Sequence, residues 1–251
     1  MKESLKQLHE SVGHLAEVVA TIDPEKYTSP AYPKEWSIAD TMSHIGSGAV
    51  ILSQRFDDIV AGTEYDQAFH QGVWDEWNAK APEDQVADAL VADGALLDRL
   101  QMIDEAGREA FEFSMGPMTF DFNGFVSLRL QEHVLHTWDI EVMGDGSVTL
   151  SEGAAAIIID RTPIYVGFAA KPIGEDLEVR VHTSDPERSF LLSFAGESVT
   201  LAVNEHGGNV DLELPGESFV RLIAGRLDAQ HTPRSVAGER LDDLRRAFPG
   251  Y

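Results

Sequence analysis

Glu132 and His136 are the most suggestive pair of metal-binding residue types in the chain. They are four residues apart, so on a helix their side chains point from the same face, one turn apart. A carboxylate and an imidazole placed in this way bind a divalent metal ion when a third ligand comes from another helix. His133 and His136 are three residues apart and also share a helix face, so spacing alone does not identify the metal ligands on this helix. The alternative is an ordinary hydrogen-bonded helix histidine, as at Glu10 and His14, which show the same interval.

His44 is the candidate third ligand, on a predicted helix that begins near Ser37. Its neighbours are small residues, which let another helix or a ligand approach closely: Ser43, Gly46, Ser47 and Gly48. Asp40 lies one turn before His44 and has two possible roles. It could orient the imidazole by accepting a hydrogen bond, or it could accept hydrogen bonds at the start of the helix. The pattern favours the second role.

The composition excludes several other kinds of chemistry. The 251 residues include no cysteine, which excludes disulfide scaffolds, cysteine-ligated zinc, iron–sulfur clusters and a cysteine nucleophile. The formal net charge of −24 argues against binding to nucleic acid or an anionic membrane. An anionic small substrate would need a local cation. Neither a secretory signal nor a long apolar run is visible in the sequence, so we expect a cytoplasmic protein.

The hydrophobic pattern predicts an α+β protein of two domains, residues 1–150 and 151–251. The first reads as an up-down bundle of four long amphipathic helices. We expect these helices at about 5–19, 37–60, 82–106 and 122–143, with a loop over 22–36, a loose acidic stretch after Gly62 and irregular structure over 108–120. The second domain begins with a helix over 151–170, interrupted or bent near Pro163. Alternating strands of an antiparallel-rich sheet follow, with a turn over 205–209 and short helices after it. We expect these strands near 177–181, 190–194, 199–203 and 210–214, and the helices near 219–223 and 241–248.

Two motifs in this order resemble the DinB-like metal-binding four-helix bundle. They are W-S-I-A-D-x-x-x-H, which ends at His44, and E-x-x-x-H-T-W-D, which contains Glu132 and His136. The glutamate makes the chain similar to the branch typified by mycothiol-dependent maleylpyruvate isomerase. The resemblance implies that His44, Glu132 and His136 are the metal ligands. The segments 222–227, 238–239 and 248–250 resemble that family's sterol-carrier-like second domain.

The resemblance also implies a function and a mechanism. A divalent metal, zinc by this resemblance, would hold the thiolate of mycothiol, which adds to the conjugated double bond of maleylpyruvate or a related electrophile. Rotation about the resulting single bond and elimination then give the trans isomer. Arg226 would bind a substrate carboxylate, although an arginine near the end of a helix is also favoured by the helix dipole. Arg129 is a weaker candidate for this role, and we expect it to form an ion pair with Glu132.

Three alternatives remain open from the sequence. The first is a mycothiol S-transferase acting on another electrophile, and the second is a hydrolase in which the same metal activates water. The third is a non-catalytic module in which the second domain binds an apolar ligand. The partners expected are a small substrate and a low-molecular-weight thiol, with neither nucleic acid nor membrane; the sequence leaves the oligomeric state open.

Overall fold

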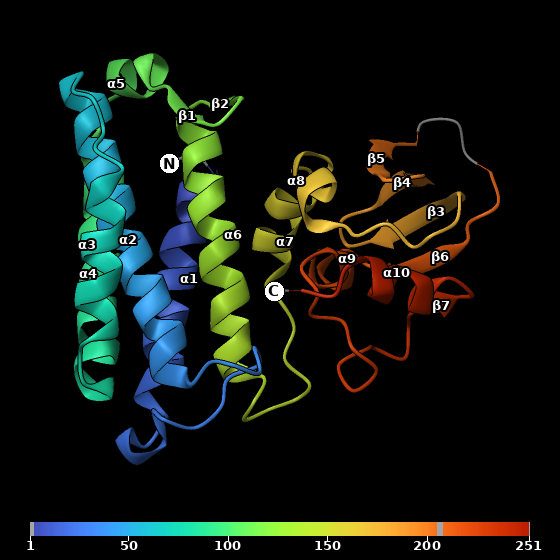
Figure 1. Ribbon diagram of the computed structural model, residues 1–251, viewed down its shortest axis with the longest axis horizontal. Helices are drawn as coiled ribbons and strands as arrows, with labels where there is room; N and C mark the ends of the chain where they lie inside the picture. The colour runs from blue at the N-terminus through green and yellow to red at the C-terminus, as the bar shows by residue number, and fades with distance from the viewer. Residues whose placement is uncertain (1–2, 205–207, 251) are drawn as a thin grey trace. The chain divides into compact units, whose positions relative to one another are not determined.

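The computed structural model describes residues 3–204 and 208–250 of the chain. These residues form two compact units, Met1–Asp145 and Gly146–Tyr251 (Figure 1). The first unit is mainly helical and the second contains a five-stranded sheet, which confirms the predicted α+β class. Among the described residues, none of the helices has the length and apolar character needed to cross a membrane.

Four long helices build the first unit. They are α1 (Glu3–Ala20), α2 (Ile38–Ala61), α4 (Pro82–Met102) and α6 (Phe122–Glu141). Helix α2 packs on α4 and α6, and α1 packs on the same two helices, so the four surround a common core (Figure 1). Apolar side chains at helical spacing, such as Leu15, Met42 and Ile45, are fully buried there. Their burial explains why an amphipathic pattern folds as a bundle.

The start of α2 follows directly from its local sequence. The Ser37 hydroxyl accepts a hydrogen bond from the Asp40 backbone N–H, and the Asp40 carboxylate accepts one from the Ser37 backbone N–H. This reciprocal capping box satisfies two backbone donors that the helix leaves unpaired. The helix ends at Gly62, which adopts a left-handed conformation with φ of 69°. Both predicted ends of this helix are confirmed.

Three connections in the first unit differ from their predictions. The acidic stretch after Gly62 contains a helix, α3 (Ala68–Asn78), whose Val73 and Trp77 are buried in the core. The helix predicted to run to residue 106 ends at Met102, and a separate helix, α5 (Glu105–Ala110), begins where the Asp104 side chain caps it. The region predicted as irregular also forms a hairpin, β1 (Phe113–Met115) and β2 (Met118–Phe120). These elements are short and depend on packing against long helices, which local patterns do not show. The predicted loop over 22–36 holds only a short 3₁₀ turn, Pro24–Lys26.

The second unit begins with two helices over the region where the sequence predicts one helix, interrupted or bent near Pro163. They are α7 (Glu152–Ile159) and α8 (Thr162–Ala169). Pro163 lies in the first turn of α8, where its missing N–H costs no hydrogen bond. The predicted interruption is therefore confirmed.

A five-stranded sheet with the strand order β5-β4-β3-β6-β7 follows these helices. Its strands are β3 (Leu177–Ser184), β4 (Arg188–Ala195), β5 (Ser198–Val203), β6 (Leu212–Pro215) and β7 (Ala237–Gly238). All neighbours are antiparallel except β3 and β6, which are parallel. Strand β6 begins at Leu212 rather than at Val210, which is 50% exposed. Helices α9 (Gly216–Ile223) and α10 (Leu241–Ala247) complete the unit, and 205–207 of the predicted turn lie outside the described residues.

Candidate metal site

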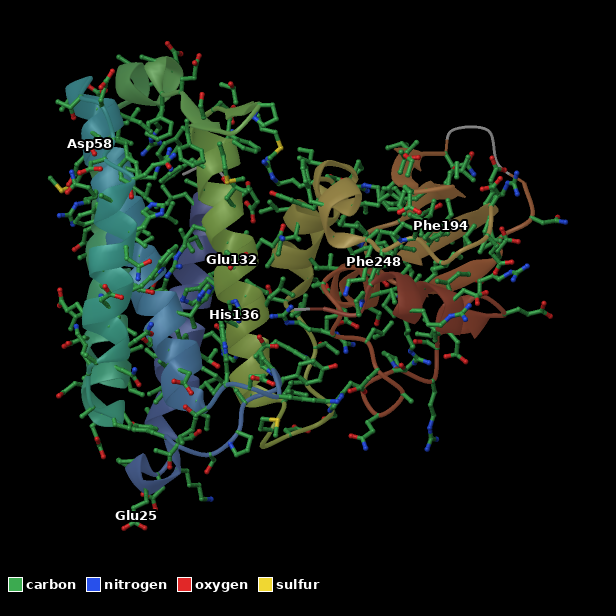
Figure 2. The ribbon with its side chains drawn as sticks, in the orientation of Figure 1. Glu25, Asp58, Glu132, His136, Phe194 and Phe248 are labelled. Carbon is green, nitrogen blue, oxygen red and sulfur yellow. The ribbon has the colours of Figure 1, made fainter. Side chains whose placement is uncertain are left out.

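His44, Glu132 and His136 converge from two helices of the first unit. His44 comes from α2, while Glu132 and His136 lie one turn apart on α6 (Figure 2). One possible ligand atom from each residue lies within 4.8 Å of the other two. The Nε2 atoms of His44 and His136 are 3.4 Å and 3.6 Å from the same oxygen, Oε2 of Glu132. Two imidazole nitrogens and a carboxylate oxygen are a donor set that suits a divalent ion such as zinc.

Solvent reaches this cluster from one side. The side chains of His44 and Glu132 are 42% and 51% exposed, whereas that of His136 is 11% exposed. An open cleft of the first unit extends from His44. The cleft is lined by Glu35, Trp36, Asp40, His44, Ser47, Trp74 and Asn78. A small molecule therefore has room to reach the His44 side of the cluster.

Asp139 determines which nitrogen of His136 faces Glu132. The Nδ1–H of His136 donates a hydrogen bond to Oδ2 of Asp139 at 2.8 Å, and Asp139 is fully buried. Nε2 of His136 is therefore the nitrogen that faces the carboxylate of Glu132. A proton or a metal ion between Nε2 and the carboxylate oxygen makes this contact favourable. This arrangement fits a bound cation.

Trp36 forms an aromatic wall beside both histidines. Its ring centroid lies 5.0 Å from that of His44 and 5.6 Å from that of His136, and the second pair is stacked. The two imidazoles are 4.6 Å apart in an edge-on arrangement. The indole restricts the rotation of both rings and so helps to keep their Nε2 atoms directed at Glu132.

The electrostatic environment favours the ionised form of Glu132. Crowding by protein atoms opposes ionisation even though solvent reaches half of the side chain. The hydrogen bonds and charge of His136 and His44 outweigh this effect and hold the pKa of Glu132 well below its ordinary value. The carboxylate is thus charged at neutral pH, as a metal ligand must be.

His133 and Arg129 take their partners from other helices and not from the cluster. His133 is fully buried, where its Nδ1 lies 2.7 Å from the Ser11 hydroxyl and its Nε2 lies 3.0 Å from Asp93. The predicted ion pair between Arg129 and Glu132 is wrong, because Arg129 pairs with the buried Asp93 on α4. Helix α6 thus carries both the cluster residues Glu132 and His136 and the buried pair Arg129 and His133.

The remaining candidates of the first unit have ordinary structural roles. Asp40 caps α2 and makes no contact with His44 among its hydrogen bonds. His14 pairs with Glu141 at 2.9 Å, and Glu10 pairs with Lys6. The interval shared by Glu10 and His14 thus marks an ordinary helix surface.

Arg226 belongs to the second unit and is 6% exposed. It lies three residues beyond the end of α9, and its Nη1 donates a hydrogen bond to the Ala224 carbonyl at 2.8 Å. The preceding Gly225 has φ of 71°, and a Cβ atom there would lie 2.2 Å from Gly250. Two of the three C-terminal segments identified in the sequence, 222–227 and 248–250, therefore meet at this point. The role of Arg226 toward a substrate stays a prediction.

Two residues of the candidate site have roles that the sequence reasoning missed. Trp36 and Asp139 belong to the two sequence motifs that contain the candidate ligands, but the sequence alone assigns neither of them a role. The signal for Asp139 was its spacing of three residues after His136, which places it within reach of Nδ1 on a helix. For Trp36, which precedes α2, the sequence carried no comparable signal.

Comparisons with known proteins identify the family and the fold of the chain. Residues 8–141 match a family model described as the mycothiol maleylpyruvate isomerase N-terminal domain. Two crystal structures of mycothiol-dependent maleylpyruvate isomerase, one of a histidine-to-alanine mutant, have similar folds with a TM-score of 0.65 each. Each similarity covers 90% of this chain and 89% of the other, at identities of 14% and, for the mutant, 13%. No protein in the curated set matches. The family model spans more than half of the chain, which therefore belongs to the mycothiol maleylpyruvate isomerase N-terminal domain family.

Proposed function

We propose that the chain is a metal- and mycothiol-dependent enzyme that isomerises maleylpyruvate or a related electrophile between its cis and trans forms. The observation that carries this proposal is the convergence of His44, Glu132 and His136 on one point beside an open cleft. Family membership and the similar fold of mycothiol-dependent maleylpyruvate isomerase support the same reaction.

The residues present fit a divalent metal, and we propose zinc. His44 and His136 would supply Nε2, and Glu132 would supply a carboxylate oxygen, which leaves coordination positions for an outside ligand. When bound, the metal would stabilise the thiolate of mycothiol over the thiol at neutral pH. The protein's own contribution is to keep the proton of His136 at Nδ1, to keep Glu132 ionised and to leave the cluster open to the cleft.

The lining of the cleft contains no lysine or arginine among the described residues. Its acidic members, Glu35 and Asp40, would repel the carboxylates of maleylpyruvate, so a cation from elsewhere must balance this charge. We propose Arg226 for this role. Its support is the resemblance of the Gly225-Arg226 segment to the second domain of the family.

Metal content tests the ligand set. We expect purified protein to hold about one equivalent of metal per chain by mass spectrometry, and His44→Ala to hold almost none. His14→Ala is the matched control, because His14 is also a helix histidine beside a glutamate but lies outside the cluster. Wild-type protein that stays metal-free after purification without chelators and after incubation with zinc would overturn the metal site.

Activity with and without mycothiol tests the reaction. We expect isomerisation of maleylpyruvate only when mycothiol and metal are both present. Equal rates of isomerisation without the thiol would reject the thiolate role. A hydrolysis product formed by the metal-loaded protein without thiol would identify the hydrolase, in which the metal activates water. Turnover of other electrophiles with mycothiol, but not of maleylpyruvate, would identify an S-transferase.

A further inference from the structure

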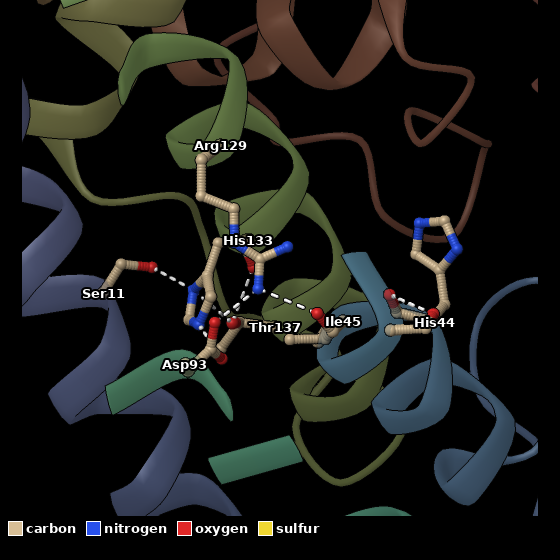
Figure 3. A network of polar contacts seen from close by, with 8 residues as sticks. Ser11, His44, Ile45, Asp93, Arg129, His133 and Thr137 are labelled. Atoms are coloured by element: carbon tan, nitrogen blue, oxygen red, sulfur yellow. Dashed lines mark hydrogen bonds and ion pairs between the residues drawn. The ribbon is translucent and has the colours of Figure 1, made fainter. Parts of the chain in front are cut away.

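A buried polar network lies inside the helical unit, behind the candidate metal site (Figure 3). Asp93 on α4 accepts hydrogen bonds from Nη2 of Arg129 and from Nε2 of His133, the latter at 3.0 Å. Nδ1 of His133 and the Ser11 hydroxyl on α1 are joined by a hydrogen bond of 2.7 Å. Asp93, Arg129 and His133 are each at most 2% exposed. Charged groups so fully buried need their partners in place.

Arg129 extends this network to α2. Its Nη2 also donates a hydrogen bond to the backbone carbonyl of Ile45 at 2.9 Å (Figure 3). Ile45 follows His44 directly, and Arg129 lies three residues before Glu132. One guanidinium group therefore joins α6, α4 and α2 at the level where α2 and α6 carry the candidate ligands.

The sequence of α2 makes room for this contact. A Cβ atom at Gly48 would lie 3.2 Å from Nη1 of Arg129, so a larger residue would press on the guanidinium. The nearby Gly46 packs against Trp77 and the backbone of Ala89, which brings α4 close to α2. Small residues near His44 thus serve the approach of Arg129 and α4.

Stability alone explains this network poorly. The Nε atom of Arg129 is buried and has no hydrogen-bond partner among the described residues, which is unfavourable. A buried ion pair is also commonly no more stabilising than apolar side chains of similar volume. A buried charge that bonds to the backbone beside a candidate ligand is better explained by a role in positioning.

We propose that Arg129 is a positioning residue that holds His44 in register with Glu132 and His136. Through Ile45 it restrains the turn of α2 that carries His44, and through Asp93 its own guanidinium is kept in place. This inference rests on the proposed function, because the register of His44 with Glu132 and His136 serves metal binding. The register itself is a property of the protein without metal.

The test replaces the ion pair by apolar residues of similar size in the double variant Arg129→Met/Asp93→Leu. Changing both partners avoids leaving one buried charge unpaired. The matched control is Arg99→Met/Asp57→Leu, which removes an exposed arginine–aspartate pair between α4 and α2, two of the three helices that Arg129 joins. Far-UV circular dichroism and thermal unfolding of the metal-free proteins show whether each variant folds.

Two measurements then report on the register. The first is the affinity for Co²⁺, by competition with a chromophoric chelator, and the second is the nuclear Overhauser effect between the rings of His44 and His136 without metal. These ring centroids are 4.6 Å apart in the structure. We expect the folded double variant to bind Co²⁺ at least about tenfold more weakly and to lose most of the ring contact. The control should match wild type in both.

A folded double variant with wild-type Co²⁺ affinity and an intact ring contact would overturn the proposal. If the double variant does not fold, Arg129→Lys decides, because lysine keeps the charge but lacks the rigid fork of arginine. That variant should show the same two losses, and wild-type values for both would again contradict the proposal. Wild-type protein that binds no Co²⁺ would contradict the proposed function, while the ring contact would still decide the role of Arg129.

Discussion

Nδ1 of His136 is 2.8 Å from Oδ2 of Asp139, and the two residues lie one turn apart on α6. Asp139 is fully buried, so water does not reach its side of this hydrogen bond. This hydrogen bond leaves Nε2 as the nitrogen that faces Glu132. A fully buried carboxylate at this place fixes the orientation and tautomer of a candidate ligand before any metal arrives.

Replacing Asp139 by asparagine should therefore weaken metal binding without unfolding the protein. An amide can donate to Nδ1 and so shift the proton to Nε2, where it blocks the ligand atom. We expect a loss of about 10- to 100-fold in metal affinity, measured by chelator competition. The control is Asp40→Asn, which alters a helix cap in the cleft beside the cluster and should cost at most about 1 kcal/mol of stability with little change in affinity. Equal affinities for Asp139→Asn and wild type would refute the orienting role.

The buried Asp93 should make the protein sensitive to acid. Burial opposes its ionisation, but the charges of Arg129 and His133 and their hydrogen bonds lower the pKa of Asp93 from 3.8 to about 2. The folded state thus binds this proton less readily than the unfolded state. The stabilisation is complete above the unfolded pKa and is lost as the pH falls from about 5 towards 2.

Denaturant unfolding of wild type and Asp93→Asn across this range checks the effect. The stability advantage of wild type should shrink by roughly 2 kcal/mol between pH 5 and pH 2, since one pKa unit corresponds to about 1.4 kcal/mol. A difference that stays constant over this range would show that Asp93 has an ordinary pKa in the folded state.

Gly46 should tolerate no side chain. A Cβ atom there would lie 2.2 Å from the ring of Trp77 and 2.8 Å from the Ala89 backbone, so α4 or the indole would have to move. We expect Gly46→Ala to lower the free energy of unfolding by about 1–3 kcal/mol through overpacking. The contrasting variant is Gly13→Ala in α1, where a Cβ atom meets nothing within 4 Å. It should raise stability by roughly 0.5–1 kcal/mol, because alanine favours a helix. Urea unfolding measures both, and the same sign for the two would contradict the packing argument.

The second unit should depend on a buried ion pair near Arg226. Nε and Nη2 of Arg221 donate two hydrogen bonds to Glu217, at 2.8 Å and 2.9 Å, and Arg221 is 1% exposed. Its Nη1 also donates to the His231 carbonyl at 2.9 Å. Glu217→Ala leaves this guanidinium without its buried carboxylate and should cost about 3–5 kcal/mol.

The surface pair of Arg246 and Asp243 is the comparison for this prediction. Arg246 is 65% exposed, so Arg246→Ala should change the free energy of unfolding by at most about 1 kcal/mol. Unfolding by urea, followed by circular dichroism, gives both values. A small loss for Glu217→Ala would show that solvent or another group replaces the carboxylate.

Much of the fold was predictable because the signals are local. The capping box of Ser37 and Asp40, the end of α2 at Gly62 and the alternation in β3 to β5 all depend on residues a few positions apart. The shift from a period of 3.6 to a period of two predicted a helical region followed by a sheet. Short elements such as α3 and the β1–β2 hairpin were missed, because their stability comes from the long helices beside them.

For the candidate site, the sequence by itself determined the residue types, their spacing on α6 and the family motif that joins His44 to Glu132 and His136. It did not determine which partner each polar side chain of α6 takes. Glu132 and His136 join His44, whereas Arg129 and His133 take partners far away in the chain. Asp93 is 36 residues from Arg129, and Ser11 is 122 residues from His133. Only the tertiary structure brings these groups together, because a buried charge takes its partner from whichever helix packs against it, and no local pattern records that helix.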